Sequence, residues 1–124
     1  MDIRILFAED DPLNRLVFNA ILKNQSCLIT WVENGLQAIE VFKESNFDLV
    51  VLDIRMPGKN GYEVTQFIRK ERHSMIPVLA LTADQSVSEK RRCLEAGMNG
   101  YLSKPVSKEA LLEEIRRLTA LQTR

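Results

Sequence analysis

The sequence lacks the features that mark membrane-spanning and exported proteins. No run of apolar residues approaches the ~18 that a helix needs to cross a bilayer. The N-terminus has no charged start followed by a long apolar core and a small-residue cleavage site. We therefore predict a soluble, cytoplasmic protein that does not insert directly into membranes.

The sequence also lacks an excess of charge of one sign. Lys and Arg together number 17, Asp and Glu together also number 17, and the formal net charge is zero. No dense run of Lys and Arg interrupts this balance. Direct binding to nucleic acid is therefore not expected.

Cysteine is scarce, with Cys27 and Cys93 as the only two in the chain. Their spacing fits no metal-binding motif, and disulfides are rare in cytosolic proteins. We expect both residues to be free thiols, buried or half-buried.

Low-complexity segments and linker-like stretches are also missing. The 124 residues are close to the commonest size of a single domain, and 45% hydrophobic and 27% charged residues are ordinary for a globular protein. We therefore predict one domain over residues 1–124, without a separate output domain.

What the sequence does contain is a regular alternation of two patterns. Five short apolar runs predict strands: residues 3–8, 27–32, 49–52, 77–81 and 100–103. Amphipathic stretches predict a helix after each of them. The first starts at Asp11-Pro12, the second is opened by Asn34-Gly35, the third is marked by Val64, Phe67 and Ile68, the fourth covers about residues 87–96, and Ser107 caps the fifth. Strands that alternate with helices indicate an α/β fold, a doubly wound five-stranded parallel sheet with helices on both faces.

Polar side chains follow the strands at the points where the strands end. They are Glu9, Asp10 and Asp11 after the first strand, Asp53 after the third, Thr82 after the fourth and Lys104 after the fifth. The carboxyl ends of parallel strands meet at one edge of a sheet, where ligands bind in open α/β folds. Each side chain alone has an ordinary explanation, such as a helix cap for Asp11, but their convergence indicates a site.

The acids of this predicted site need a partner of opposite charge. Clustered carboxylates repel one another, and burial strengthens the repulsion. A hard divalent cation between Asp10 and Asp53, with Glu9 nearby, removes that cost, and Mg²⁺ prefers such oxygen ligands. With a lysine across from the metal, an aspartate carboxylate can act as a nucleophile that forms an aspartyl phosphate.

These stretches resemble the receiver domain of two-component response regulators. The matching segments are ILFAEDD, DLVVLDIRMPGKNG, IPVLALTA and GMNGYLSKP, in the family's order and spacing, and the resemblance extends over essentially the whole chain. It implies a flavodoxin-like (βα)5 fold with the strand order 2-1-3-4-5. It also implies a signalling phosphoacceptor of a two-component or phosphorelay system, which catalyses its own phosphorylation and dephosphorylation and is not a classical enzyme.

The resemblance implies a metal site built on the acids. Asp10 and Asp53 hold Mg²⁺ directly, and Glu9 acts through a water molecule. The backbone carbonyl of Arg55 completes the protein ligands. Mn²⁺ can replace Mg²⁺ in such a site, because it accepts the same oxygen ligands.

The same resemblance implies a switch driven by phosphorylation. Asp53 accepts the phosphoryl group from a phosphohistidine, and Lys104 pairs with the phosphoryl oxygens. The Thr82 hydroxyl moves toward the modified Asp53 and the ring of Tyr101 follows, which changes the surface offered to a partner. The peptide between Lys104 and Pro105 is expected to be cis.

Two further residues lie near the site in this scheme. Position 55 varies within the family, and here it is Arg55. With Asp84, two residues past Thr82, it flanks the route of the water that attacks the aspartyl phosphate. We hypothesise that an Arg55–Asp84 pair shields the acyl phosphate and lengthens its lifetime.

The expected partner is a histidine kinase or a histidine phosphotransfer domain. The segments LALTAD and AGMNGYLSKP resemble receivers attached to hybrid sensor kinases. In those, the first helix and the loop around Pro105 dock a histidine-bearing helical partner, so Leu13, Val17 and Pro105 are candidate apolar anchors. The alternative is that Leu13 and Val17 only face the core. We expect a monomer or a weak dimer that pairs through the fourth helix.

Other functions fit the sequence less well. An aspartate-nucleophile phosphohydrolase needs an acid two residues after the nucleophile, where this chain has Arg55. A flavin-binding module needs a phosphate-binding loop after the first strand, where this chain has acids. A receiver-like module that binds partners without phosphorylation is the remaining alternative, although such modules usually lose a key residue and this chain keeps them all.

Overall fold

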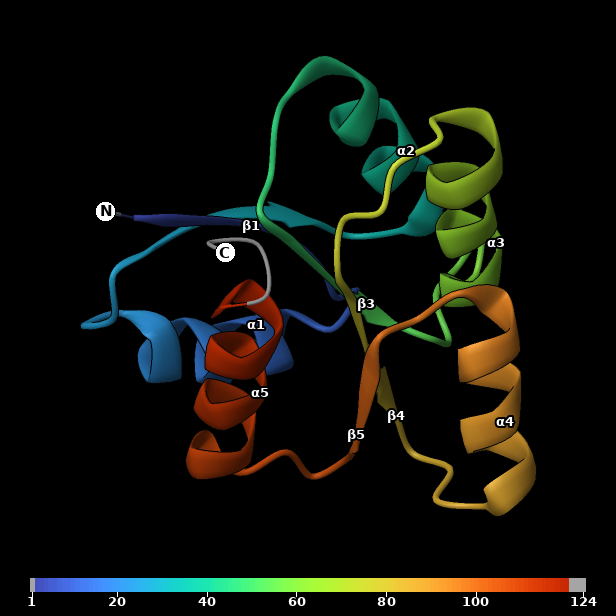
Figure 1. Cartoon of the computed structure of the whole chain (residues 1–124). Helices are drawn as coiled ribbons and strands as arrows, with labels where there is room; N and C mark the ends of the chain where they lie inside the picture. The colour runs from blue at the N-terminus through green and yellow to red at the C-terminus, as the bar shows by residue number, and fades with distance from the viewer. Residues whose placement is uncertain (1, 121–124) are drawn as a thin grey trace.

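Five parallel strands form one sheet in the order β2-β1-β3-β4-β5 (Figure 1). This computed structural model describes residues 2–120. The strands are β1 (Ile3–Ala8), β2 (Cys27–Val32), β3 (Leu49–Asp53), β4 (Val78–Thr82) and β5 (Gly100–Ser103). The helices are α1 (Pro12–Leu22), α2 (Gly35–Glu44), α3 (Gly61–Gln66), α4 (Val87–Ala96) and α5 (Lys108–Ala120), and a π-helical segment, η1 (Phe67–Glu71), continues α3.

The predicted flavodoxin-like α/β fold and its strand order are confirmed, with small differences in the element bounds. β3 extends one residue further than predicted, to Asp53, and β4 begins and ends one residue later, at Val78 and Thr82. The sequence pattern does not predict η1. A single π-helical turn inside a longer helical stretch leaves the apolar spacing almost unchanged.

Two apolar layers cover the two faces of the sheet, and β3 contributes to both. Val50 and Leu52 pack in the layer that contains α2, α3 and α4, whereas Leu49 and Val51 pack in the layer that contains α1 and α5 (Figure 1). All four residues are 0% exposed. A strand that is buried on both faces is apolar at every position, which explains the run LVVL.

Local signals start and end the helices where the sequence predicts. Asp11 accepts a hydrogen bond from the Leu13 amide at 2.9 Å, and Pro12 occupies the first turn of α1. Gly97 ends α4 in the left-handed conformation, with a φ of 99°. The Asp11 cap follows β1 at the carboxyl edge of the sheet, and the Gly97 cap precedes β5 at the opposite edge.

Both cysteines are free thiols, as predicted. Cys93 is buried against α3, and Cys27 is half-buried on β2. Burial raises the pKa of each thiol. Separately, no helix within residues 2–120 combines the length and the apolar character needed to span a bilayer.

The exposure of α1 decides between the two interpretations of its apolar residues. Phe18 and Leu22 are the buried residues of this helix. Leu13, Leu16 and Val17 are 66%, 68% and 50% exposed, so the interpretation that Leu13 and Val17 face the core is wrong. The helix carries two apolar stripes, and only one of them meets the sheet.

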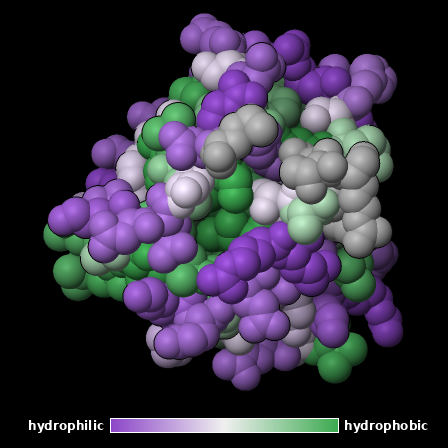
Figure 2. All heavy atoms as spheres, turned by 60° about the vertical axis from the view of Figure 1, so that its left-hand side comes forward, coloured by the Kyte–Doolittle hydropathy of each residue, from purple (hydrophilic) through white to green (hydrophobic). Residues whose placement is uncertain are grey.

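Exposed apolar groups of this kind stand out against a mostly polar surface. Polar residues cover most of the face shown in Figure 2, and the apolar atoms visible there occupy smaller areas between them. Single exposed apolar residues are normal, but several on adjacent turns of one helix form a patch that suggests a contact surface.

Candidate functional site

The strand register brings the predicted site residues to one edge of the sheet. Asp53 ends β3, and its partner in β4 is Leu81, the residue before Thr82. Glu9 and Lys104 follow directly after β1 and β5. Residues from distant parts of the chain therefore meet at the carboxyl edge, as expected for an open parallel sheet.

Three carboxylates form the centre of the site. One oxygen atom from each of Glu9, Asp10 and Asp53 lies within 4.8 Å of the others. Glu9 is 0% exposed and Asp53 is 6% exposed, whereas Asp10 is exposed to solvent. Carboxylate oxygens are the ligands that Mg²⁺ prefers, so this donor set fits the predicted ion.

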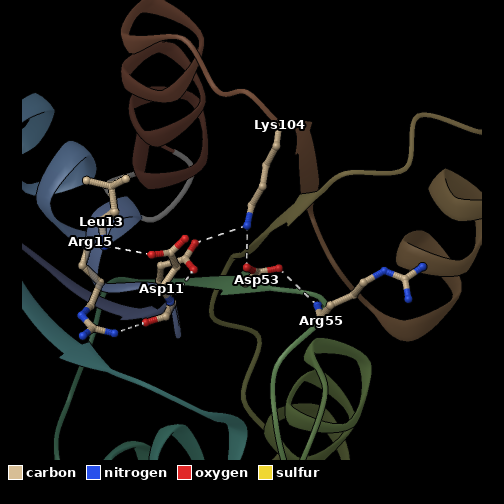
Figure 3. Close-up of polar contacts among 7 residues, drawn as sticks. Asp11, Leu13, Arg15, Asp53, Arg55 and Lys104 are labelled. Atoms are coloured by element: carbon tan, nitrogen blue, oxygen red, sulfur yellow. Dashed lines mark hydrogen bonds and ion pairs between the residues drawn. The ribbon is translucent and has the colours of Figure 1, made fainter.

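Lys104 offsets part of the negative charge of this cluster (Figure 3). Its Nζ lies 2.6 Å from Asp53 Oδ2 and 3.4 Å from Glu9 Oε1. Burial lowers the pKa of Lys104, but the hydrogen bond to Asp53 and the charges of Asp53 and Glu9 outweigh burial, so the pKa is raised. Lys104 therefore stays protonated at this edge of the sheet.

Glu9 is the most deeply buried acid of the site. Burial raises the pKa of its carboxyl group, and the charge of Asp53 adds to this rise. The amide of Asp11 donates to Glu9 Oε2 at 3.1 Å and opposes the rise, as does Lys104. The net pKa is above the usual range, so the charged form of Glu9 is disfavoured in the absence of a cation.

Arg15 supports Glu9 from α1, although nothing in the sequence pattern assigns it to the site. Its Nη1 donates to the carbonyl oxygen of Glu9 at 2.7 Å (Figure 3), and its Nη2 lies 3.6 Å from Glu33 Oε1. The one signal in the sequence is a basic residue four positions after the Asp11 cap. That spacing places Arg15 one helical turn away, beside the acids.

Both carboxylate oxygens of Asp53 have a partner. Oδ2 accepts from Lys104, and Oδ1 accepts from the amide of Arg55 at 3.2 Å. In Figure 3 the Arg55 side chain points away from Asp53. The backbone of Arg55 therefore lies next to the acids, and the role of its carbonyl as a metal ligand stays a prediction.

The predicted pair of Arg55 and Asp84 is not an ion pair in the structure. Among the described residues no ion pair joins them, and Asp84 Oδ1 instead accepts from the amide of Ser86 at 2.8 Å. Hydrogen bonds from Ser86 lower the pKa of Asp84, and the charge of Arg55 acts in the same direction. The shielding role of the Arg55–Asp84 pair stays a prediction.

Thr82 and Tyr101, the predicted switch residues, lie on neighbouring strands. Thr82 is 2% exposed, and its Oγ1 accepts from the Asp84 amide at 3.0 Å. Within residues 2–120 its hydroxyl donates no hydrogen bond to Asp53. Tyr101 is half-buried against the α2–α4 layer, with Lys90 Nζ 5.7 Å from the centre of its ring. Their movements stay predictions.

The predicted docking residues are accessible. Leu13 and Val17 are 66% and 50% exposed, and Pro105 is also exposed. Figure 3 shows Leu13 close to Asp11, beside the acids. The peptide between Lys104 and Pro105 is cis, as predicted.

A cleft of about 480 Å³ extends from Asp10 along the β3–α3 loop to α4. At its far side the Tyr62 hydroxyl donates to Glu89 Oε1 at 2.6 Å, and the guanidinium of Arg92 lies 4.1 Å from the centre of the Tyr62 ring. Burial, followed by the hydrogen bond to Glu89, raises the pKa of Tyr62. These contacts join α3 to α4 beside the site, and no sequence motif predicts them.

The sequence of this chain is similar to those of known proteins. The family model of the response regulator receiver domain matches residues 5–116. The sensor histidine kinase GacS of Pseudomonas protegens is 37% identical over 125 residues, which cover 98% of this chain and 14% of that kinase. This chain thus corresponds to a small part of the length of that curated relative.

Solved structures with the same fold agree with the sequence comparison. The receiver domain of the sensor histidine kinase PA1611 from Pseudomonas aeruginosa PAO1, with a magnesium ion in its active-site cleft, is 34% identical with a TM-score of 0.87, over 97% of this chain and 99% of that chain. A chain from the complex of the Saccharomyces cerevisiae phosphotransfer protein Ypd1 with the Ssk1 receiver domain is 28% identical with a TM-score of 0.90, over 98% and 91%. The present chain therefore belongs to the response regulator receiver domain family.

Proposed function

We propose that this chain accepts a phosphoryl group from a phosphohistidine on Asp53, within a two-component or phosphorelay system. One observation carries the proposal: the buried Asp53 carboxylate lies 2.6 Å from Lys104, and one of its oxygens is within 4.8 Å of oxygens of Glu9 and Asp10. A carboxylate between a fixed cation and metal-binding acids is suited to attack phosphorus.

The transfer uses the Asp53 carboxylate as the nucleophile. A carboxylate oxygen forms a bond to phosphorus while the bond from phosphorus to the histidine nitrogen breaks, and the imidazole leaves with the electron pair. Dephosphorylation ends the modified state. A water oxygen attacks the same phosphorus, the bond from phosphorus to the carboxylate oxygen breaks, and inorganic phosphate and the free carboxylate are released. The chain therefore supplies the groups for its own modification and its loss without being a classical enzyme.

Glu9, Asp10, Asp53 and the Arg55 carbonyl would hold Mg²⁺, or Mn²⁺ in its place. The ion supplies positive charge that offsets the negative oxygens of the incoming phosphoryl group. Lys104 stays protonated because its pKa is raised, so it can exchange Asp53 Oδ2 for a phosphoryl oxygen.

Phosphorylation would then bias the loop after β4. The hydroxyl of Thr82, whose oxygen now accepts from the Asp84 amide at 3.0 Å, would donate its proton to one of the new phosphoryl oxygens on Asp53. Movement of Thr82 opens space beneath the ring of Tyr101. The surface of α4, β5 and α5 changes in consequence, and this change is what a partner would detect.

The phosphoryl donor would be a histidine kinase or a histidine phosphotransfer domain that docks through Leu13, Val17 and Pro105. Support comes from the exposure of Leu13 and Val17 beside the acids, 66% and 50%. The Ssk1 relative, which forms a complex with a histidine phosphotransfer protein, adds an analogy. We place this activity in the cytoplasm, on a monomer or a weak dimer.

The test is the mass of the intact chain after incubation with acetyl phosphate, with and without Mg²⁺. We expect one phosphoryl adduct that requires Mg²⁺ and disappears in Asp53→Ala. Asp48→Asn, which removes a half-buried acid at the opposite edge of the sheet, is the matched control and should keep the adduct. A folded chain that binds Mg²⁺ and forms no adduct would instead support a partner-binding module that works without phosphorylation.

A further inference from the structure

The loop between β3 and α3, residues 54–60, carries part of the proposed metal site. It follows Asp53 directly and includes Arg55, whose carbonyl is the proposed last protein ligand. The base of the loop is closed by a hydrogen bond from the Gly61 amide to the Ile54 carbonyl, 3.0 Å long. The placement of the Arg55 carbonyl therefore depends on what holds the rest of this loop.

The middle of the loop, residues 56–59, has no hydrogen-bonded support. Within the part of the chain that the structure describes, no hydrogen bond involves the backbone of these four residues. Gly58 adopts a φ of 76°, a conformation that side chains with a Cβ disfavour. Packing against a neighbouring element, rather than hydrogen bonding, must set the position of this segment.

Met56 is 8% exposed and packs in the core layer, and the first turn of α2 supplies the packing around Gly58 and Lys59. A Cβ atom added to Gly35 would lie 1.9 Å from the carbonyl oxygen of Lys59, 2.6 Å from its carbonyl carbon and 2.7 Å from its Cβ. Two of these are backbone atoms, which cannot rotate away as the end of a side chain can. The Leu36 side chain lies beside Gly58, 3.5 Å from the place that a Cβ on Gly58 would take. Only glycine at position 35 allows this approach.

We propose that Gly35 is a positioning residue for the metal site, because its backbone contact with Lys59 sets the place of the β3–α3 loop and hence of the Arg55 carbonyl. This inference rests on the proposed function, which assigns Mg²⁺ to the acids and to Arg55. A larger residue at position 35 displaces Lys59 and weakens Mg²⁺ binding, although every proposed ligand remains in the chain. Coupling is reciprocal, so Mg²⁺ in turn stabilises the Gly35–Lys59 contact.

The first experiment compares Mg²⁺ affinity in Gly35→Ala and Gly100→Ala by isothermal titration calorimetry, with no phosphodonor present. At Gly100, on the amino end of β5, an added Cβ would approach side chains alone, those of Glu114, Arg117 and Leu79. We expect Gly35→Ala to weaken Mg²⁺ binding by about tenfold and Gly100→Ala to change it by less than about twofold. A folded Gly35→Ala chain with unchanged Mg²⁺ affinity would overturn the inference.

The second experiment uses the unaltered chain, so it decides the matter even if Gly35→Ala does not fold. In a Mg²⁺ titration followed by ¹⁵N NMR, we expect the amide resonances of Gly35 and Gly58 to shift with the Kd measured by calorimetry, while that of Gly100 stays in place. A Gly35 resonance that does not respond would contradict the inference.

These outcomes separate the inference from the proposed function. If the unaltered chain binds no Mg²⁺, both the proposed metal site and the role of Gly35 are overturned. If the unaltered chain binds Mg²⁺ and forms the Asp53 adduct while Gly35→Ala binds Mg²⁺ equally well, the inference alone fails.

Discussion

At the scale of a single residue, Glu9 serves the proposed site at a cost in the stability of the fold. It is 0% exposed, burial raises its pKa, and the charge of Asp53 raises the pKa further. Lys104 neutralises this pair of acids only in part, because its Nζ is 2.6 Å from Asp53 and 3.4 Å from Glu9. Without a cation the negative charge of Glu9 therefore lowers the stability of the folded chain.

Glu9→Gln should therefore stabilise the metal-free chain at neutral pH while it weakens Mg²⁺ binding. Glutamine keeps an oxygen that can accept the Asp11 amide and removes the buried charge. We expect the free energy of unfolding in urea, measured with a chelator present, to rise on the order of 1 kcal/mol, the usual scale of one polar substitution. The exposed acid of Glu113→Gln is the control, and it should change neither quantity.

The same argument predicts a pH dependence. The folded-state pKa of Glu9 lies above its ordinary value of 4.5, so protonation favours the folded chain, and that contribution is lost as the pH rises through the raised pKa. The advantage of Glu9→Gln over the unaltered chain should therefore be small near pH 4.5 and grow toward neutrality. Unfolding curves of both chains at several pH values, all without metal, measure it. An advantage that is independent of pH would contradict the assignment to Glu9.

A further prediction for single residues concerns Arg55, Asp84 and the lifetime of the phosphorylated state. The charge of Arg55 acts on Asp84 although no ion pair joins them, and both flank the proposed path of water. Arg55→Asn and Asp84→Ala should each speed the loss of the phosphoryl group by only roughly threefold, since two exposed charges that form no ion pair influence each other weakly. The decay of the mass adduct after removal of the donor measures the rate. Unchanged decay in both variants would refute the shielding hypothesis.

At the scale of elements, Arg69 of η1 joins segments that are far apart in the chain. Its Nε and Nη2 donate to the Gly97 carbonyl at 3.1 and 2.8 Å, and Nη2 also donates to Asn99 Oδ1 at 2.8 Å. Its Nη1 donates to the carbonyls of Ser74 and Ile76 at 2.9 and 2.7 Å. All five guanidinium N–H groups are thus used, and they hold the end of α4 and the start of β4 to η1.

Arg69→Met should lower the free energy of unfolding by roughly 2–3 kcal/mol, because three partly buried carbonyl oxygens lose a charged donor at once. Urea unfolding followed by circular dichroism measures the change. Lys70→Met removes the neighbouring exposed cation of η1 and should cost little. Equal effects of the two substitutions would mean that the Arg69 hydrogen bonds add nothing beyond its charge.

For the molecule as a whole, the fold could be predicted because local signals agree with one another. The unbroken run LVVL matches a strand covered on both faces, and the caps at Asp11 and Gly97 match the helix bounds. Consistency of this kind across levels is what specifies a fold. The sequence did not predict which face of α1 is buried. Spacing alone places Leu13 and Val17 on a helix but does not say which side of that helix meets the sheet.

Some residues of the candidate site could be predicted from the sequence and others could not. Asp53, Thr82 and Lys104 could be placed together because each stands at the end of a strand, and the ends of parallel strands converge. The role of Arg15 could not be predicted, because it depends on how far its side chain reaches. The approach of Gly35 to Lys59 could not be predicted either, because it is a backbone contact between separate elements. No period in the sequence encodes such contacts.

The arrangement of the whole molecule leads to a last prediction, that partner docking and phosphoryl chemistry can be separated. Leu13 and Val17 lie on the exposed stripe of α1, outside the core and outside the acid cluster, so their removal should leave the chemistry of Asp53 intact. Leu13→Ser combined with Val17→Ser should slow phosphotransfer from a phosphorylated histidine phosphotransfer domain by about tenfold, the effect of losing an interface anchor. The rate with acetyl phosphate should not change.

A matched control lies on the opposite side of the molecule. Leu94 of α4 is 58% exposed, similar to the two α1 residues, and Leu94→Ser should leave both rates unchanged. Single-turnover transfer measured by gel or mass spectrometry distinguishes the cases. Slower reaction with acetyl phosphate in the α1 variant would mean that α1 supports the site itself, as Arg15 does through the Glu9 carbonyl. Slower transfer from the protein donor in Leu94→Ser alone would mean that the docking surface lies on α4 and not on α1.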